Sequence, residues 1–290
     1  MIKFQKFQGT GNDFIIINES DLTNEDYSDL AKKICDRHYG VGADGMIVVS
    51  ESTKADIRMK FYNADGSIAS MCGNGIRCFS KFVYENGLIN RKSFDVETLA
   101  GIMKPEVIVD DDGKVTFVKV NLGKPIFTSK EIPLSNANKY FIDEEIIVGE
   151  NCLNISSLVI GTIHTVLFVN DFNGLDIKYI GQSIGYNNIF PAKTNVNFCK
   201  IINDKNIEVI TWEKGVGITL ACGTGAAASA IVSSILKNCD KKVNVKVLGG
   251  NLVIEQKDNE IFMTGDAEFI CRGEYKFIKK NCKRRCLGDV

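Results

Sequence analysis

The sequence is poor in long apolar runs, in net charge and in histidine, and each shortage excludes a class of protein. No run in the 290-residue chain approaches the roughly 18 apolar residues of a membrane-spanning helix, and the first residues lack the apolar core of a signal peptide. A net charge of −1 and a pI near 6.2 offer no basic surface for nucleic acid or for an anionic membrane. We therefore expect a soluble cytoplasmic protein whose partner is a small molecule.

Metal ligands are also scarce. The chain has two histidines, and its ten cysteines form no pair of Cys-x-x-Cys motifs, since five residues separate Cys72 from Cys78 and three separate Cys282 from Cys286. This spacing predicts no metal site. Most of the cysteines fit the role of small buried apolar groups in a reducing compartment, namely Cys35, Cys78, Cys152, Cys199 and Cys239.

Short strand-like runs dominate the chain, and four prolines leave most of them uninterrupted. Apolar and β-branched residues predict strands at 15–17, 46–49, 57–62, 94–98, 115–120, 165–169, 207–212 and 252–255. Helical spacing predicts helices at 26–35, 75–85 and 225–237, with another after Asp176. Strands outnumber helices, so we expect an α+β protein, and the length suits two lobes of roughly 145 residues each.

An internal repeat is the most informative feature of the sequence. The segment MCGNGIRCFSKFVYENG precedes FDVETLAG, and ACGTGAAASAIVSSILKN precedes VNVKVLGG. In both halves Cys-Gly-x-Gly begins a predicted helix, an asparagine marks the helix end, and a strand follows. Cys72 and Cys222 therefore occupy equivalent positions in two duplicated halves, which we expect to meet around residues 123–125.

The repeated turn indicates proton-transfer chemistry. The start of a helix presents unpaired backbone N–H groups and a partial positive charge, which can hold a substrate carboxylate and lower the pKa of a neighbouring thiol. If both turns face one cleft, the α-carbon of a bound amino acid lies between Cys72 and Cys222. One thiolate can then remove the α-proton while the other thiol protonates the opposite face. We therefore predict a racemase or epimerase.

Two other interpretations of these cysteines remain open. Cys72 and Cys222 could form a reversible bridge in a thiol–disulfide redox protein, which accounts for the sulfurs but not for the duplicated glycine turns. One cysteine could instead be a nucleophile activated by His164, which leaves the other without a function. For either cysteine alone, the ordinary role is that of a buried apolar thiol.

Six ordered motifs resemble those of the diaminopimelate epimerase family. They are GTGNDF at 9–14, GVGADG at 40–45, FYNADGS at 61–67, MCGNGIRCF at 71–79, FPAKTNVNF at 190–198, and WEKG with ACGTG within 212–225. The resemblance extends from Gly9 to about Gly265. It implies two pseudo-symmetric lobes, each a β-barrel-like sheet wrapped around a central helix, with the active site in the cleft between them.

The resemblance also implies a domain division and a chemistry. The N-terminal lobe would comprise residues 1–122 with a returning C-terminal strand within 265–290, and the C-terminal lobe residues 123–264. Catalysis in the family needs no pyridoxal phosphate, metal or other cofactor. The implied reaction interconverts LL- and meso-diaminopimelate for lysine or cell-wall synthesis, and a homodimer is common.

By the same resemblance, Cys72 and Cys222 are the catalytic base and acid. The implied substrate-binding residues are Asn12, Asn63, Asn195 and Glu213 of the cleft, Lys214 beside them, and the backbone amides of Gly73, Asn74, Gly223 and Thr224. Asn63, Asn195 and Glu213 match contacts to the distal, non-reacting end of the substrate. Asp44 and Asp65 are expected to fix turns and loops.

Three motifs depart from the family pattern. Where the family has G-N-P-H, E-R-G and G-E-T, this chain has GTIH at 161–164, EKG at 213–215 and GIT at 217–219. The replaced Asn and Arg contact the distal end of the substrate in the family, and Thr162 and Lys214 stand in their places. A lysine cannot reproduce the two-pronged bond of arginine to a carboxylate.

Two substrates are therefore considered. One is diaminopimelate, with Lys214 as the partner of its distal carboxylate. The other is an amino acid with a single carboxylate, such as histidine or a basic residue. His164 is either a hydrogen-bonding group beside the cleft or a histidine satisfied within a strand. The basic segment KKNCKRRC at 279–286 is expected to be a solvated end.

Overall fold

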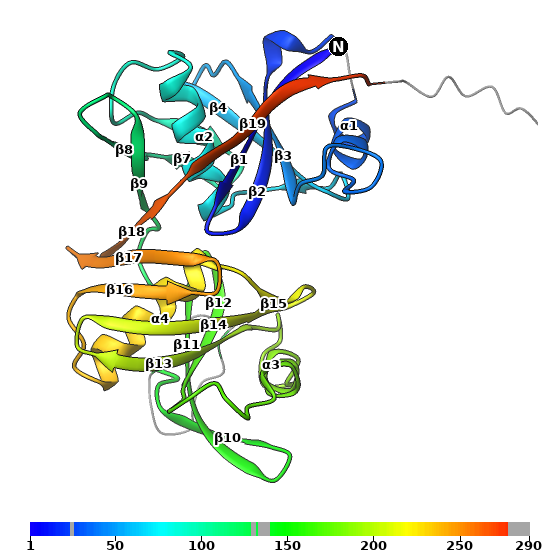
Figure 1. Ribbon diagram of the computed structural model, residues 1–290. Coiled ribbons are helices and arrows are strands. Elements are labelled where there is room, and N and C mark those ends of the chain that lie inside the picture. Colours follow the sequence, from blue (N-terminus) through cyan, green and yellow to red (C-terminus); the bar gives the residue numbers. More distant parts are fainter. Residues whose placement is uncertain (24–25, 129–131, 133–139, 278–290) are drawn as a thin grey trace, which may run out of the picture.

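The molecule consists of two sheets, each wrapped around its own helix, and the two sheets lie one above the other (Figure 1). The computed structural model describes residues 1–23, 26–128, 132 and 140–277. The predicted α+β class and two-lobed architecture are confirmed. The basic segment at 279–286, with Cys282 and Cys286, lies outside the described residues.

The first lobe contains a sheet with the strand order β19-β1-β2-β3-β4-β6-β7, to which β5 adds by pairing with β4. Its strands are β1 (Ile2–Gly9), β2 (Asn12–Asn18), β3 (Gly45–Ser50), β4 (Ile57–Asn63), β5 (Ile68–Ala69), β6 (Val96–Thr98), β7 (Gly101–Met103) and β19 (Glu268–Tyr275). Helix α2 (Gly73–Glu85) is enclosed by this sheet, whereas α1 (Tyr27–Ile34), preceded by the 3₁₀ turn η1 (Glu19–Asp21), packs on the outer face.

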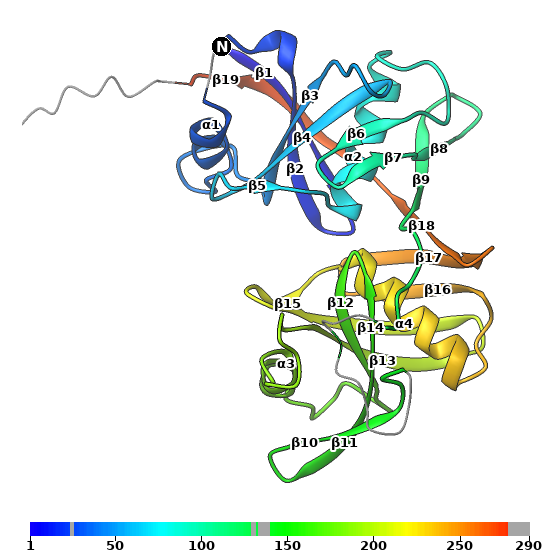
Figure 2. The same cartoon turned by 180° about the vertical axis from the view of Figure 1, so that it is seen from behind.

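The second lobe is larger and has the strand order β10-β11-β12-β13-β14-β16-β17-β18-β9-β8, with β15 paired to β14. Its strands are β8 (Glu106–Val109), β9 (Val115–Asn121), β10 (Glu144–Val148), β11 (Asn151–Ile160), β12 (Thr162–Phe168), β13 (Asn195–Asn203), β14 (Asn206–Glu213), β15 (Gly217–Thr219), β16 (Lys242–Val247), β17 (Gly250–Lys257) and β18 (Glu260–Asp266). Helix α4 (Gly223–Leu236) runs through the middle, and α3 (Ile177–Gly185) lies at one side (Figure 2).

Helix α4 is central because it is apolar on all sides. Its first turns carry Ala226, Ala227, Ala228 and Ala230, all fully buried. A helix without a polar face must be enclosed, and alanine side chains let the surrounding strands approach its backbone closely. The predicted helix at 225–237 therefore becomes the core of the second lobe.

The two lobes share strands as well as a surface. Strands β8 and β9 hydrogen-bond into the second sheet through β18, yet their buried valines pack against α2 of the first lobe. At its C-terminal end the second sheet's β18 leads into β19, which pairs with β1 in the first lobe. Sheet pairing thus places both β8 and β9 in the second lobe, whereas side-chain packing places both in the first lobe. The division at residue 122 stays a prediction.

Most of the strand and helix predictions coincide with observed elements. The strand predicted at 94–98 is shorter, because only Val96–Thr98 pairs as β6. The helix expected after Asp176 begins there, with the Asp176 carboxylate accepting from the backbone N–H of Tyr179. Among the described residues, no helix is long and apolar enough to cross a membrane.

The backbones of the two lobes pack directly against each other, and this contact leads to a prediction about stability. A Cβ atom on Gly249, in the turn between β16 and β17, would lie 1.9 Å from the carbonyl oxygen of Thr10 in the first lobe. We expect Gly249→Ala to force this contact apart and to lower the free energy of unfolding by about 1–3 kcal/mol. Urea denaturation measures the change, with Leu248→Ala in the same turn as control, because Leu248 is exposed. An unchanged midpoint for Gly249→Ala would contradict this account.

Candidate active site

The duplicated turns meet at the junction of the lobes. Cys72 is the N-cap residue of α2 and Cys222 that of α4, and both have extended backbone conformations. Met263 of β18 is fully buried between the turns: a Cβ on Gly223 would lie 2.6 Å from its sulfur, and one on Gly73 3.1 Å from its methyl group. The absence of a side chain at Gly73 and Gly223 leaves room for Met263 between the two helix starts.

A cavity of about 610 Å³ opens between the lobes beside these turns. The first lobe contributes Gly11, Asn12, Phe14, Arg37, Asp44, Phe61, Asn63, Ala69, Met71 and Cys72, and the second contributes Glu213, Val216, Thr219, Leu220 and Ala221. Of the residues that the sequence suggested, Asn12, Asn63, Cys72 and Glu213 line this cavity. Arg37, Phe14 and Thr219 are lining residues that the sequence analysis did not identify.

The remaining suggested residues lie behind or beside the cavity wall. Asn74 is 3% exposed, Cys222 8% and Asn195 5%. The side-chain oxygen of Asn195 accepts from the backbone N–H of Lys214 at 3.0 Å, so Asn195 holds the loop that carries Lys214. The ammonium group of Lys214 donates to the carbonyl oxygen of Ala192 at 3.1 Å.

His164 is fully buried on β12 and bonded on both ring nitrogens. Its Nε2 lies 2.9 Å from the hydroxyl of Thr224, and its Nδ1 lies 3.3 Å from the side-chain nitrogen of Asn197. Since an amide NH₂ can only donate, Nδ1 accepts and Nε2 carries the proton. Burial lowers the pKa of His164 to about 3, so the ring is neutral.

This geometry separates the two interpretations of His164. The imidazole is a satisfied strand histidine, and it also supports the Cys222 turn through Thr224, whose hydroxyl lies 3.5 Å from the sulfur of Cys222. Thr162, at the start of the same strand, is half-buried. The adjoining Gly161 packs against the methyl group of Thr224.

The two thiols have different electrostatic surroundings. Burial raises the pKa of Cys72, whereas the backbone N–H groups of Gly75 and Asn74 and the charge of Arg77 lower it. Burial also raises the pKa of Cys222, to about 12, and the carboxylate of Glu213 raises it further. The helix-start effect expected from the sequence is therefore present, but burial outweighs it in both cases.

Glu213 connects the second thiol to the cavity. Its Oε1 accepts from the hydroxyl of Thr219 at 2.7 Å. Burial raises the pKa of Glu213, while the bond from Thr219 and the neighbouring Cys222 thiol lower it. The carboxylate of Glu213 in turn raises the pKa of Cys222.

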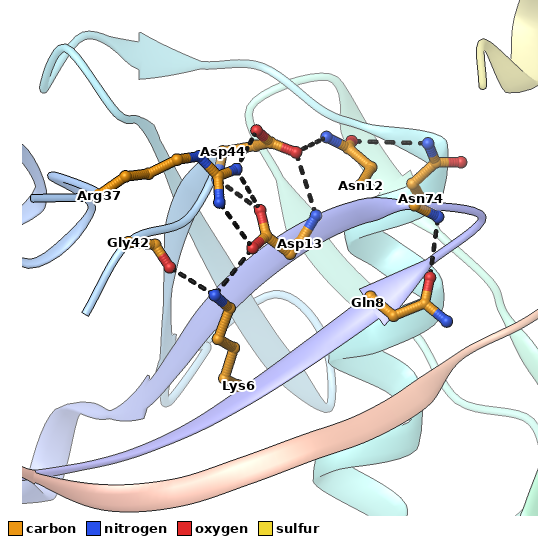
Figure 3. Close-up of polar contacts among 9 residues, drawn as sticks. Lys6, Gln8, Asn12, Asp13, Arg37, Gly42, Asp44 and Asn74 are labelled. Carbon is orange, nitrogen blue, oxygen red and sulfur yellow. Dashed lines mark hydrogen bonds and ion pairs between the residues drawn. The ribbon is translucent and has the colours of Figure 1, made fainter. Parts of the chain in front are cut away.

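A network of charges fixes Asn12 on the opposite wall (Figure 3). Asp44 accepts from the side-chain NH₂ of Asn12 and from Arg37, and Arg37 also pairs with Asp13 at 2.8 Å. Lys6 completes the network through Asp13 at 2.8 Å. Asp44 fixes this loop, as the sequence predicted, and it also orients a cavity residue.

No group of three or more His, Cys, Asp or Glu side chains suited to a metal ion occurs in the described part of the chain. The reactive groups at this junction are the two thiols, Glu213 and the helix-start amides.

The fold matches solved structures of racemases and their relatives. A probable proline racemase from Agrobacterium radiobacter matches with a TM-score of 0.69 at 12% identity, covering 97% of this chain and 95% of that one. A phenazine biosynthesis protein of the PhzF family from Bacillus anthracis matches with a TM-score of 0.66 at 19% identity, covering 95% and 99%. Identities this low show the fold alone. The chain thus shares the fold class of a probable proline racemase and of a phenazine biosynthesis protein.

The sequence comparisons identify the family within this class. The model of the diaminopimelate epimerase family matches residues 4–128 and 157–270. Diaminopimelate epimerases of Caldanaerobacter subterraneus subsp. tengcongensis and Methanococcus maripaludis are 48% and 40% identical, over 94% of this chain and 99% of each relative. The chain belongs to the diaminopimelate epimerase family.

The contact between Glu213 and Cys222 generates a second prediction. A nearby carboxylate disfavours the thiolate, so Glu213→Gln should lower the pKa of Cys222 and increase its thiolate fraction, about tenfold if the pKa falls by one. The rate of Cys222 alkylation by iodoacetamide, followed by peptide mapping from pH 7 to 10, measures this change. Glu208→Gln on the same strand is the control, because Glu208 pairs with Lys246 on the surface. Slower alkylation in Glu213→Gln would rule out this electrostatic effect.

Proposed function

We propose that this protein epimerises diaminopimelate between the LL and meso forms by two-base chemistry at Cys72 and Cys222. The observation that carries the proposal is the meeting of two helix N-termini, each headed by a cysteine, beside one cavity between the lobes. The names of relatives at 40–48% identity support the substrate.

The reacting carboxylate binds at the helix starts in this proposal. The unpaired N–H groups of the first turns of α2 and α4 belong to Gly73, Asn74, Gly223 and Thr224, and they can hold an anion without any cationic side chain. Their positive ends also stabilise the negative charge that spreads into the carboxylate when the α-proton leaves. Removal of the α-proton needs no cofactor in this scheme.

The two thiols divide the proton transfer according to their surroundings. Cys72, beside backbone N–H groups and Arg77, is the base and removes the α-proton. Cys222, beside Glu213, starts as a thiol and gives its proton to the opposite face of the α-carbon. One proton is taken and one is delivered, so the product differs from the substrate only in configuration. The reverse reaction exchanges the two roles.

The distal end of the substrate faces Asn63, Glu213 and the loop that carries Lys214. We propose that Lys214 exchanges its bond to the Ala192 carbonyl for a bond to the distal carboxylate. A carboxylate taken from water needs such a partner, because an unpaired buried charge costs several kcal/mol. An amino acid with a single carboxylate, such as histidine, is the alternative substrate and would not need Lys214.

We also propose that the enzyme works in the cytoplasm as part of lysine biosynthesis. The cysteines of the described residues are free thiols, which suits a reducing compartment. Homodimer formation stays a prediction from the family resemblance.

The acid/base assignment predicts that Cys72→Ala and Cys222→Ala each lose activity while remaining folded. Each face of the α-carbon needs its own proton carrier, and a general acid or base contributes about 10²–10⁴-fold in rate. Circular dichroism assays epimerisation under dithiothreitol, with Cys152→Ala, an exposed cysteine, as control. Full turnover by either variant would refute the mechanism. Loss of a dithiol oxidase activity instead would favour the redox interpretation.

The substrate assignment is tested at position 214. We expect wild type to favour diaminopimelate, and Lys214→Arg together with Thr162→Asn to raise kcat/KM for it severalfold, because the planar guanidinium binds a carboxylate bidentately. Lys200→Arg, on β13 of the same lobe, is the control, because Lys200 pairs with Asp171. Proton NMR in deuterated water also follows α-proton exchange into histidine, lysine and other amino acids. Rapid exchange into one of these, with slow turnover of diaminopimelate, would identify a single-ended substrate.

A further inference from the structure

Arg77, one turn inside α2, is a fully buried cation that the reaction scheme uses only as a nearby charge. Its guanidinium donates to the side-chain oxygen of Asn74 at 2.9 Å, to the hydroxyl of Thr10 at 3.0 Å and to the backbone carbonyl of Asp266 at 2.9 Å. It also reaches the carbonyl oxygen of Gly73 at 3.2 Å. These partners come from three separate segments that meet at the junction of the lobes.

No carboxylate is hydrogen-bonded to Arg77, although the charge of the nearby Asp266 raises its pKa. None of the ion pairs among the described residues involves it, and its contact at position 266 is to the backbone. Burial lowers the pKa of Arg77, but an arginine side chain stays protonated in proteins. An apolar residue of similar volume would be less costly to bury. The charge and the donor fork of Arg77 therefore require an explanation other than stability.

The bonds of Arg77 fix the orientation of two amides. A guanidinium only donates, so the oxygen of Asn74 faces Arg77 and its NH₂ faces away. That NH₂ points to the oxygen of Asn12 at 3.5 Å and to the backbone carbonyl of Ala221 at 3.4 Å.

Hydrogen bonds lead from Arg77 through Asn74 to Asn12, and the carboxylate of Asp44 fixes the far end of this series. Asp44 only accepts at neutral pH, so the NH₂ of Asn12 faces Asp44 and the oxygen of Asn12 faces inward (Figure 3). This oxygen lies 3.7 Å from the sulfur of Cys72. The series from Arg77 through Asn74 and Asn12 to Asp44 thus has one possible polarity, and it presents a hydrogen-bond acceptor to the proton of Cys72.

Arg77 reaches Asn12 by a second route through the hairpin between β1 and β2. Thr10 has φ 51°, a left-handed conformation that is unfavourable for a β-branched residue, and it is 1% exposed. Its hydroxyl bonds to Arg77, and the turn that it shapes places Asn12 opposite Gly9 and beside the cavity. The strained turn is therefore anchored to the same guanidinium.

We propose that Arg77 is a positioning residue for the epimerase reaction, one that orients Asn74 and Asn12 and keeps the Cys72 turn at a fixed distance from the Cys222 turn. This inference rests on the proposed two-thiol function. The bond from Asn74 to the carbonyl of Ala221, the residue before Cys222, is the tie across the lobes. The bond from Arg77 to Asp266 anchors the same residue to the point where β18 leads into β19.

The experiment compares Arg77→Met, Arg77→Lys and Asn74→Asp with wild type. Arg77→Met removes both the positive charge and the N–H donors of the guanidinium, whereas Arg77→Lys keeps the charge. Asn74→Asp keeps the acceptor for Arg77 but removes the NH₂ that reaches Asn12 and Ala221. We expect all three to lower kcat for diaminopimelate, by about 10²-fold for Arg77→Met. KM should change less, because Arg77 does not line the cavity. Ser80→Ala is the matched control, since Ser80 is buried in the same helix and bonds only to its own turn.

Alkylation provides a readout that a packing defect would not produce. The charge of Arg77 lowers the pKa of Cys72 and is not among the largest influences on that of Cys222. The pH midpoint for iodoacetamide labelling of Cys72 should therefore rise in Arg77→Met and stay near the wild-type value in Arg77→Lys, while that of Cys222 stays unchanged in both.

Each outcome decides the inference. Equal changes of the midpoint at both thiols, or normal kcat in Arg77→Met, would show that Arg77 only packs the core and would overturn it. If Arg77→Met is insoluble, Arg77→Lys and Asn74→Asp give the kinetic answer, and wild-type kcat in both overturns the inference. A wild-type enzyme that is inert on diaminopimelate but shows the selective change at Cys72 would refute the proposed function while supporting the role of Arg77.

Discussion

The positive ends of two helix dipoles face one small region at the junction of the lobes. Like ends repel each other, and the buried charge of Arg77 adds to the same positive potential. The region therefore stabilises anions: a bound carboxylate, a thiolate or the carboxylate of Glu213. Met263 and the glycines around it permit this close approach, and the alanines of α4 allow the surrounding sheet to hold the helix in place.

Gene duplication alone would give two equivalent thiols, whereas the chemistry needs one to accept a proton while the other donates one. The structure breaks the equivalence with neighbours that the repeat does not share. The charge of Glu213 raises the pKa of both thiols, but the charge of Arg77 lowers that of Cys72, and the hydroxyl of Thr224 lies beside Cys222. A symmetric scaffold thus carries an asymmetric pair of proton carriers, and the asymmetry lies in side chains just behind the two repeated turns.

The sequence predicted the central helices, fewer than half of the described strands and both cysteine turns, because these depend on local periodicity and on a repeated motif. It did not identify Arg37 as a cavity residue or Arg77 as the centre of a polar network, since both depend on segments far apart in the chain. It placed Asn195 and Lys214 in the cleft, which stays a prediction; in the structure the side chain of Lys214 bonds to the carbonyl oxygen of Ala192. Strand β9 shows the same limit: the sequence predicted a strand at 115–120, but it predicted neither its neighbour β8 nor the sharing of both strands between the lobes.

The passage of β9 and β18 between the lobes restricts how the halves can move. These neighbouring antiparallel strands form a ribbon, with Asn121 opposite Phe262 and Phe117 opposite Asp266. A single tether would let one lobe swivel in any direction, but a hydrogen-bonded ribbon resists twisting and in-plane shear and bends mainly across its flat face. The pairing of these two strands therefore limits how far one lobe can turn against the other, and with it how far the Cys72 turn can move from the Cys222 turn.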